Sequence, residues 1–387
     1  MLALVFSLIL HVSSGERIND ALDSARAVFA ERAERTTILI APGTYYEQLT
    51  IDVPGVRLIN AGKRPSIALT NHGVDCHKEA VRISWYHGHG YQYTSMGEQI
   101  NYGGSRTRRW NASVLVTAPD FYAENIIFEN SFNLYVSPAE ALDEPTPIPS
   151  LKEGERTMPV RPKEVGSTAV QSLFYRERAA AISFTETATN ARLKNCRATG
   201  RQDVLYGDQG ASVYWQGGIL QGGVDFIFGA MRMVADRVTI VANVNHEKGD
   251  KCYIAAGRSG SDSIPARGLL FYQCHIRYAT DDELQIVNRQ SSYRQSVWLA
   301  RPWRWWGETV WAYTTWDKQV NLQPEGWSTG LVKRQEGFIT GGICPHCYEY
   351  RSQDKSLGRP AWVQVLHRPR LPDGPPLNPR TWLNTAK

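Results

Sequence analysis

Short segments of similar character recur along this chain at intervals of about 20 residues. Each has a polar residue near its middle and apolar or small residues on both sides. Asn195, Gly217 and Asp236 occupy this middle place in three of them, at intervals of 22 and 19 residues. A propeller blade needs about twice this length, whereas a solenoid of stacked parallel strands fits it. We therefore predict an all-β fold, a parallel β-helix. The segments are FYAENIIFEN (121–130), ARLKNCRATG (191–200), VYWQGGILQG (213–222), MVADRVTIVA (233–242) and LFYQCHIRYA (270–279).

The first 35 residues contain an apolar run followed by a helical pattern. Met1–Leu10 has the length of a secretory signal peptide but lacks basic residues, and its end would serve equally as a first strand. Residues 1–16 therefore stay open between a signal peptide and a first strand. Apolar residues then recur at helical spacing, which predicts a short N-terminal helix over 17–35. They are Ile18, Ala21, Leu22, Ala25 and Val28.

The rest of the chain is predicted to form one domain. Stacked coils share a continuous core, so we expect the β-helix to run over residues 17–350 without a division. Residues 132–170 interrupt the pattern with six prolines and many charges, which indicates a Pro-rich loop insertion extended beside the body. Residues 351–387 are rich in Pro and Arg, and we expect this C-terminal tail to pack on the solenoid.

Charge and hydropathy exclude two classes of protein. The net charge is +5 over 387 residues, which is too diffuse for a protein that binds nucleic acid. No second apolar run is long enough to span a membrane. We expect a monomer with no nucleic-acid partner and no membrane span.

Two aspartates lie in hydrophobic settings 22 residues apart. Asp203 precedes Val-Leu, and Asp225 precedes Phe-Ile-Phe, where a solvated loop acid would have polar neighbours. If one coil has about 22 residues, the two carboxylates meet on adjacent coils, about 4.8 Å apart. Two close, partly desolvated carboxylates titrate as a coupled pair, which suits acid/base or nucleophilic chemistry. Gln202 lies next to the first aspartate and is a candidate donor to an oxyanion.

Four motifs in order resemble those of the pectin methylesterases, a family of carbohydrate esterases. Gly200–Tyr206 resembles the Gln-Asp-Thr-Leu motif of that family, and Val224–Gly229 its Asp-Phe-Ile-Phe-Gly motif. Leu299–Trp303 is similar to Leu-Gly-Arg-Pro-Trp, and Pro42–Glu47 to the Gly-x-Tyr-x-Glu element. One such motif is weak evidence, but four in order are strong. The resemblance implies a right-handed parallel β-helix, secreted or extracellular, that hydrolyses methyl esters of pectin (methylated homogalacturonan) without a cofactor.

The resemblance also implies unequal roles for the two aspartates. Asp225 would attack the ester carbonyl, while Asp203 would protonate the departing methanol and then activate water. Gln202 would stabilise the oxyanion, and Arg301 would hold Asp225 ionised and oriented. The implied substrate-binding residues are Trp303, Tyr206 and Phe228.

One position departs from the family pattern. Where the family has Gln-Ala-Val-Ala-Leu, this chain has Arg178 followed by Ala-Ala-Ala-Ile. Arginine is also a hydrogen-bond donor, so Arg178 stays in the predicted catalytic set, but it adds a charge beside the aspartates. Two alternatives therefore stay open: a β-helix esterase that acts on another ester or a thioester, and a β-helix that binds polysaccharide without catalysis.

Several other residues invite a functional interpretation. His87 and His89 have no acidic or cysteine partner nearby in the sequence, so we expect loop histidines near the cleft and no metal site. Trp305 and Trp306 stay open between sugar contact and packing. We expect Cys344 and Cys347 to be free thiols or a local disulfide. The segment 357–362 imitates the arginine motif but lies in the tail.

Overall fold

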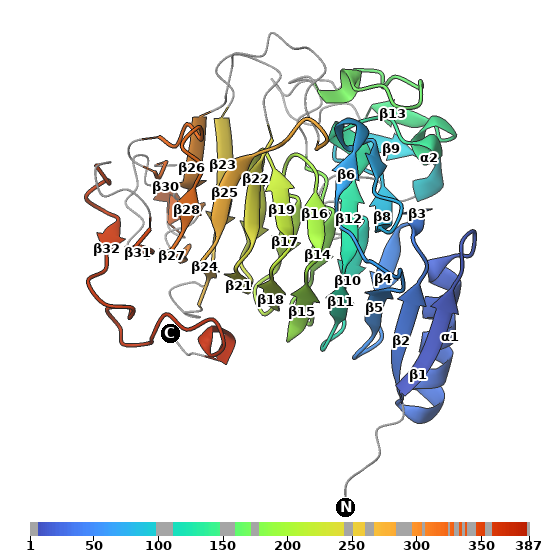
Figure 1. Cartoon of the computed structure of the whole chain (residues 1–387), viewed down its shortest axis with the longest axis horizontal. Helices are drawn as coiled ribbons and strands as arrows, with labels where there is room; N and C mark the ends of the chain where they lie inside the picture. Colours follow the sequence, from blue (N-terminus) through green and yellow to red (C-terminus); the bar gives the residue numbers. More distant parts are fainter. Residues whose placement is uncertain are drawn as a thin grey trace, which may run out of the picture.

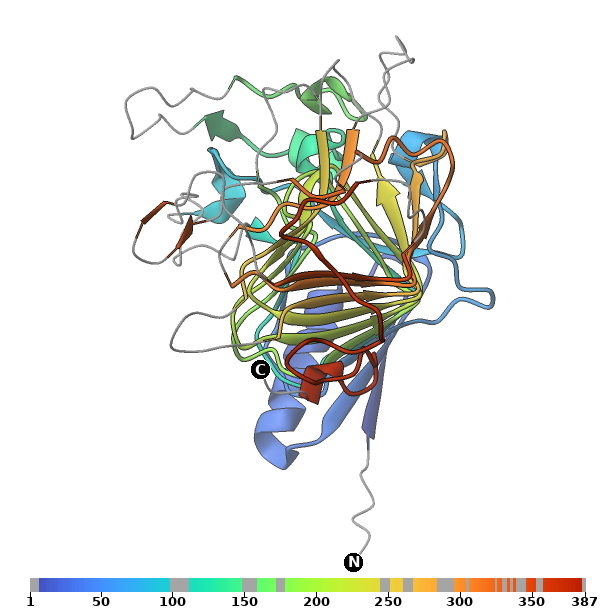
Figure 2. The ribbon, with the colours of Figure 1, turned by 90° about the vertical axis from the view of Figure 1, so that its left-hand side faces the viewer.

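The computed structural model describes residues 7–97, 111–147, 159–171, 178–243, 251–259, 267–283, 296–303, 306–323, 326–328, 333–334, 337–338, 346–352 and 358–384. Three sheets of parallel strands run along one axis (Figure 1). We name them sheet A (11 strands), sheet B (eight) and sheet C (seven). Between residues 182 and 316, each coil contributes one strand to sheet C, then one to A and one to B. Viewed along the axis, the coils lie one behind another (Figure 2). The predicted parallel β-helix is confirmed.

Within each sheet, every strand is hydrogen-bonded to the strands named before and after it. Sheet A contains β1 (Ser7–Val12), β2 (Arg35–Ile40), β5 (Arg57–Asn60), β11 (Tyr122–Glu124), β15 (Ala191–Lys194), β18 (Ser212–Gln216), β21 (Arg232–Asp236), β24 (Leu269–Tyr272), β27 (Thr309–Ala312), β31 (Cys347–Tyr350) and β32 (Gln364–Val365). Sheet B contains β3 (Gly43–Tyr46), β8 (Val81–Trp85), β12 (Ile126–Asn130), β16 (Arg197–Thr199), β19 (Ile219–Gly222), β22 (Thr239–Ala242), β25 (His275–Tyr278) and β28 (Thr315–Trp316). Sheet C contains β4 (Leu49–Ile51), β10 (Val114–Val116), β14 (Ile182–Phe184), β17 (Leu205–Gly207), β20 (Val224–Gly229), β23 (Lys251–Gly257) and β26 (Ser296–Ala300).

Two helices and several short elements complete the described structure. The helices are α1 (Ile18–Arg32) and α2 (Pro138–Ala141). The paired short strands are β6 (Leu69–Thr70) with β7 (Asp75–Cys76), β9 (Tyr91–Tyr93) with β13 (Pro145–Pro147), and β29 (Lys333–Arg334) with β30 (Gly337–Phe338). The 3-10 turns are η1 (Asn71–Gly73), η2 (Thr94–Met96), η4 (Ser131–Asn133), η5 (Ala169–Gln171) and η7 (Trp382–Asn384).

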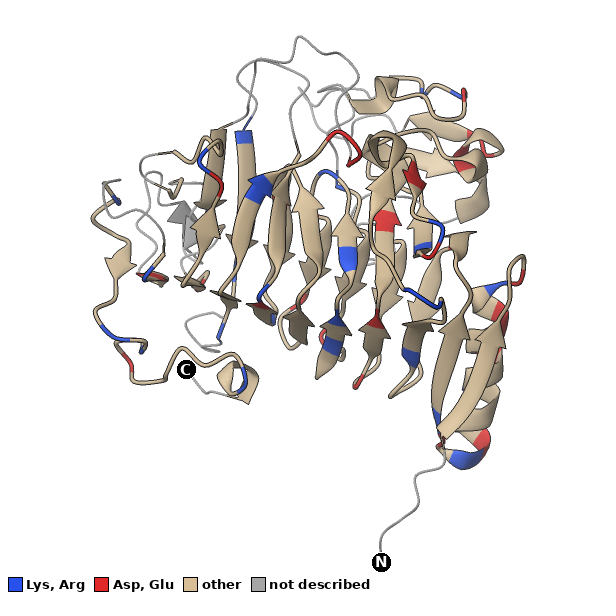
Figure 3. Ribbon diagram, in the orientation of Figure 1, with Lys and Arg blue, Asp and Glu red and all other residues tan. Residues whose placement is uncertain are grey.

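The core runs through the centre of the coils. Parallel strands in register place equivalent side chains about 4.8 Å apart, so inward residues stack in rows. In one such row the rings of Phe271 and Trp311, on neighbouring strands, stack with their centroids 3.8 Å apart. Charged residues gather mainly at strand ends and turns (Figure 3). A chain of period near 20 can therefore bury one continuous core without a division into domains.

A ladder of left-handed residues marks the turn between sheets A and B. Asn125, Asn195 and Gly217 have φ of 57°, 46° and 61°, and the amide of Asn195 donates to that of Asn125 at 2.6 Å. The sequence placed Asp236 third in this row after Asn195 and Gly217. The register pairs Asp236 with Gln216, so that placement is wrong by one residue. The left-handed residue is the next one, Arg237, with φ of 55°.

Helix α1 and the C-terminal tail both pack on the solenoid. Helix α1 confirms the predicted N-terminal helix, and it packs Ile18 and Leu22 into the core beside β1 and β2. Residues 7–12 form strand β1, the first of sheet A. The tail packs on the outer face of sheet A, where Trp382 is buried and donates to the backbone oxygen of Gly268 at 3.1 Å. The prediction that the tail packs on the solenoid is confirmed.

The described part of the Pro-rich insertion contains regular elements and a buried ion pair. Its described residues include helix α2 and strand β13, which pairs with β9. Arg161 is buried, contacts Glu140 at 2.5 Å and lies over the ring of Phe132 at 4.1 Å. The pair satisfies the general requirement that a buried charge has a partner. Among the described residues, no helix has the length and apolar character that crossing a membrane requires.

Candidate active site

The two aspartates lie in register on adjacent coils of sheet C. Gln202 pairs with Val224, and Leu205 with Ile227, which sets Asp203 opposite Asp225. The predicted meeting on adjacent coils is therefore confirmed. Both residues are buried, at 3% and 9% exposure. Both adopt a left-handed backbone, with φ of 54° and 47°, a conformation that costs an aspartate energy and recurs at functional sites.

Asp225 lies in a bulge. Val224 pairs with Tyr253 and Ile227 pairs with Ala255, so two residues of β20 face one residue of β23. After the aspartate, Phe226 and Ile227 both enter the core. The residue that the bulge adds is therefore the aspartate itself, which stays outside the core. Bulges bend a strand and redirect a side chain in this way.

Arg301 reaches Asp225 from two coils away. Its Nε donates to Asp225 Oδ1 at 2.6 Å, and its Nη2 contacts Oδ2. The strand between them, β23, carries only Ala256 at the register position of Arg301, and this small residue leaves room for the long side chain. Burial raises the pKa of Asp225, and the bidentate contact with Arg301 opposes that rise.

A pocket of about 250 Å³ opens above these residues. Arg178 lies on the preceding coil, beside Gln202, because the next residue, Ala179, donates its N–H to the backbone oxygen of Gln202 at 3.3 Å. The Nη2 of Arg178 is 2.9 Å from Nε2 of His89. All five predicted catalytic residues therefore line one pocket. The lining residues are Arg178, Gln202, Asp203, Asp225, Ala256, Arg301 and Trp303.

The three predicted substrate-binding residues take different places. Trp303 lines the pocket and packs on Phe228, with ring centroids 4.7 Å apart. Phe228 and Tyr206 are buried, at 1% and 4% exposure, and do not line the pocket. Tyr206 also donates to Asp208 at 2.8 Å. Tyr206 in turn packs on Phe228, with ring centroids 5.4 Å apart, and the role of both rings in substrate binding stays a prediction.

Of the other candidate residues, His89 contacts the pocket residue Arg178, whereas the rest of those described make their contacts elsewhere. His87 is buried, and its Nε2 lies 2.8 Å from the hydroxyl of Ser95. Trp306 stacks on His346 at 5.0 Å. The tail arginine, Arg359, binds the carboxylate of Glu349 on β31 of sheet A. Trp305, Cys344 and residue 357 lie outside the described residues. No group of three metal-ligating side chains occurs among the residues that the structure describes.

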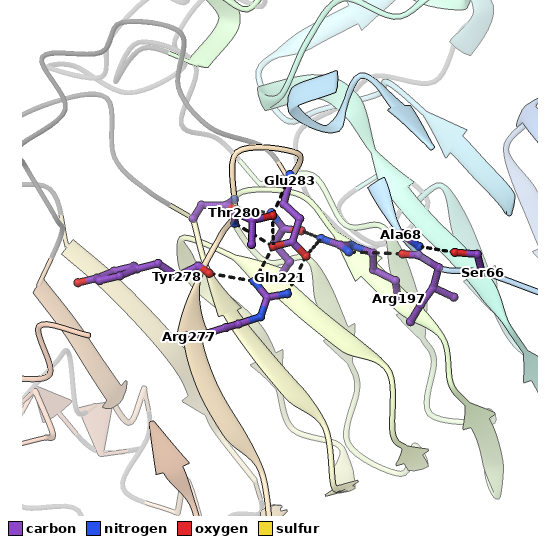
Figure 4. A network of polar contacts seen from close by, with 10 residues as sticks. Ser66, Ala68, Arg197, Gln221, Arg277, Tyr278, Thr280 and Glu283 are labelled. Carbon is purple, nitrogen blue, oxygen red and sulfur yellow. Dashed lines mark hydrogen bonds and ion pairs between the residues drawn. The ribbon is translucent and has the colours of Figure 1, made fainter. Parts of the chain in front are cut away.

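A buried polar network leads to the turn before the first aspartate. Asn243 donates from Nδ2 to the backbone oxygen of Gly200 at 2.9 Å and accepts from Gln221 Nε2 at 2.7 Å. Gln221 accepts from Arg197, whose Nη2 also lies 3.0 Å from Glu283 Oε1 (Figure 4). Side chains on four successive coils thus connect to the backbone of the turn before Asp203.

Glu283 anchors this network at the surface loop 279–283. Arg277 donates to both of its oxygens, at 2.5 and 2.8 Å, and the backbone N–H of Thr280 donates at 3.0 Å. Burial alone would raise the pKa of Glu283, but these contacts and the nearby Arg197 lower it from 4.5 to about 2. A carboxylate with these partners stays ionised across the working range of most proteins.

Comparison with known proteins gives one family. The Pectinesterase family model matches residues 168–334, which contain both aspartates and Arg301. Pectinesterase 31 of Arabidopsis thaliana is 28% identical over 240 residues, 62% of this chain and 53% of that protein. A further Arabidopsis pectinesterase relative is 23% identical over 312 residues. The chain thus spans between about half and two thirds, 53% and 65%, of the lengths of these two relatives.

Solved structures show the same fold. A pectin methylesterase from Erwinia chrysanthemi superposes with a TM-score of 0.61 at 19% identity, covering 93% of this chain and 92% of its own. The carrot pectin methylesterase gives 0.59 at 17% identity, covering 93% and 88%. A pectin methylesterase in complex with a hexasaccharide gives 0.61 at 19% identity.

Proposed function

We propose that this chain, a member of the pectinesterase family, hydrolyses methyl esters of polygalacturonate in pectin and releases methanol. The observation that carries this proposal is the pair of in-register carboxylates, Asp203 and Asp225, in one pocket with Arg301. A second support is the hexasaccharide complex of a structurally similar pectin methylesterase. The enzyme would act outside the cell, on a polymer too large to enter the pocket beyond one sugar residue.

The reaction needs one ionised and one protonated carboxyl group. Asp225, held by Arg301, attacks the ester carbonyl carbon, and the carbonyl oxygen takes the negative charge of a tetrahedral intermediate. Gln202 and Arg178 donate hydrogen bonds to that oxygen. Asp203 gives its proton to the departing methanol, which leaves an acyl anhydride on Asp225.

Water completes the cycle. Asp203, now ionised, takes a proton from water, and the resulting hydroxide adds to the acyl carbon. The C–O bond to Asp225 breaks, which returns both aspartates to their starting protonation states, and the uronic acid leaves and loses its proton to solvent as the uronate. Trp303 offers a ring face beside the reacting group, with Phe228 packed below to fix its angle.

The direct test is methanol release from highly methylated pectin between pH 4 and pH 9. We expect turnover, with activity lost as pH falls through the pKa of Asp225, which burial raises above its ordinary value. A parallel panel of acetyl esters and thioesters tests the alternative that Arg178 suggests, an esterase that acts on another ester or a thioester. Turnover of those substrates without methanol release would replace the pectin proposal. Pectin affinity without any turnover would instead support the non-catalytic alternative.

Arg178 gives a prediction that separates its charge from its hydrogen bonds. Arg178→Gln keeps an oxyanion donor, so we expect kcat within about tenfold of the wild type. Arg178→Met removes the donor, and we expect kcat to fall about a hundredfold with little change in KM. Steady-state methanol release measures both variants. Wild-type kcat in Arg178→Met would show that Arg178 does not stabilise the oxyanion.

A further inference from the structure

The guanidinium of Arg301 makes two kinds of contact. Its edge carries the donors that meet both oxygens of Asp225. Its face lies over the ring of Tyr253, with the guanidinium carbon 4.1 Å from the ring centroid. A planar cation on the face of an aromatic ring is attracted by the ring quadrupole. One residue thus defines the plane of the guanidinium, and the other defines its direction within that plane.

Tyr253 is itself held in place by a stack. Its ring lies against that of Trp298, its register neighbour on β26, with centroids 5.2 Å apart and planes 26° apart. The Nζ of Lys251 lies 5.5 Å from the centroid of Trp298 on the same outer face. These contacts alternate between β23 and β26, from Lys251 through Trp298 and Tyr253 to Arg301, and end at Asp225 on β20. Tyr253 is also the register partner of Val224, the residue before Asp225.

We propose that Tyr253 is a positioning residue, which fixes the plane of the Arg301 guanidinium so that both of its donors meet Asp225. This inference rests on the proposed esterase function. Arg301 crosses a whole coil to reach its partner, and a free arginine side chain has many rotamers, whose entropy is lost when the contact forms. The ring of Tyr253 restricts the rotamers of Arg301 before the contact with Asp225 forms, and the small side chain of Ala256 leaves room for the arginine. A misplaced guanidinium would leave the attacking carboxylate poorly aimed, because small errors of geometry are costly in catalysis.

The test compares two substitutions of the same residue. Tyr253→Phe keeps the ring face, and we expect wild-type kinetics. Tyr253→Leu removes the face, and we expect kcat on methylated pectin to fall about threefold to thirtyfold with KM little changed. The control is Tyr122→Leu, which removes the ring under Arg57 (4.5 Å) on sheet A, away from the pocket. It should leave the kinetics unchanged.

A second readout does not depend on activity. In Tyr253→Leu the contact that opposes the effect of burial is weakened, so the pKa of Asp225 rises further. NMR titration of the carboxyl carbon of Asp225 should therefore show its midpoint at higher pH than in the wild type and in Tyr253→Phe. If this shift occurs but no ester is hydrolysed, the positioning role stands and the proposed function fails. An unchanged midpoint and unchanged kcat in folded Tyr253→Leu would overturn the inference, as would an equal loss of kcat in Tyr253→Phe.

Discussion

Asp225→Asn is expected to lower methanol release from methylated pectin by at least about ten-thousandfold. The amide has the size of the carboxylate but is not a nucleophile, so the covalent step is lost. Only the rate acceleration from the other residues of the pocket remains. The loss should appear in kcat, because the residues that bind the sugar are unchanged. Initial rates of methanol release at saturating pectin, measured at pH 7, provide the value.

A matched substitution shows whether the effect is local. Asp236 is also buried and also contacts an arginine, Arg237, at 3.1 Å, but it lies on sheet A outside the pocket. Asp236→Asn should keep the rate within a fewfold of the wild type. If Asp225→Asn retained more than about one per cent of the activity, Asp225 would not be the nucleophile, and the roles assigned to the two aspartates would have to be exchanged or abandoned.

Glu283→Gln is expected to lower the free energy of unfolding by about 3 kcal/mol at pH 7. The pKa of Glu283 falls from 4.5 in the unfolded chain to about 2 in the folded protein, and each pKa unit corresponds to about 1.4 kcal/mol. A depressed pKa means that the stabilisation is present above pH 4.5 and is lost as pH falls towards 2. The glutamine also leaves Arg197 buried without its carboxylate partner.

Chemical denaturation of both proteins at pH 7 and at pH 3 measures this difference. We expect the difference in unfolding free energy to shrink to about 1 kcal/mol at pH 3. At that pH the ionised carboxylate of Glu283 stabilises the folded state less, relative to the unfolded chain, than it does at pH 7. Glu124→Gln is the control, because Glu124 pairs with the exposed Lys194 and such surface pairs contribute about 0 to 1 kcal/mol. A difference at Glu283 that did not change with pH would contradict the ion-pair explanation.

The repeat could be predicted because its cause is local. A turn residue and flanking apolar residues must recur in every coil, so the interval of 22 residues between Asp203 and Asp225 carried the register with it. The next interval, from Gly217 to Asp236, gave a register that is wrong by one residue. Coil lengths vary, and the polar residue nearest the turn need not be the one with the left-handed backbone.

The finer geometry of the site could not be predicted from the residues alone. The bulge at Asp225 depends on the pairing with strand β23 of the next coil, which no local sequence pattern specifies. The contact with Arg301 spans 76 residues and was expected only through the family resemblance. No motif marks Tyr253. Its aromatic partner Trp298 lies 45 residues further on, and only the register of the two strands makes them neighbours.

The bulge places Asp225 outside the core, while the residues that follow it pack inside. Equivalent stretches of three successive coils differ in length. The stretches Gln202–Tyr206 and Val224–Phe228 have five residues each, whereas Tyr253–Ala256 has four. Each of the three contributes two residues to the core. The shorter coil shows that the solenoid closes without the surplus residue. Asp203 and Asp225 therefore occupy a position that the coil of β23 lacks, in a backbone conformation that aspartate adopts at a cost. Insertion or deletion of one residue at this position adds or removes a side chain outside the core and leaves the core rows unchanged.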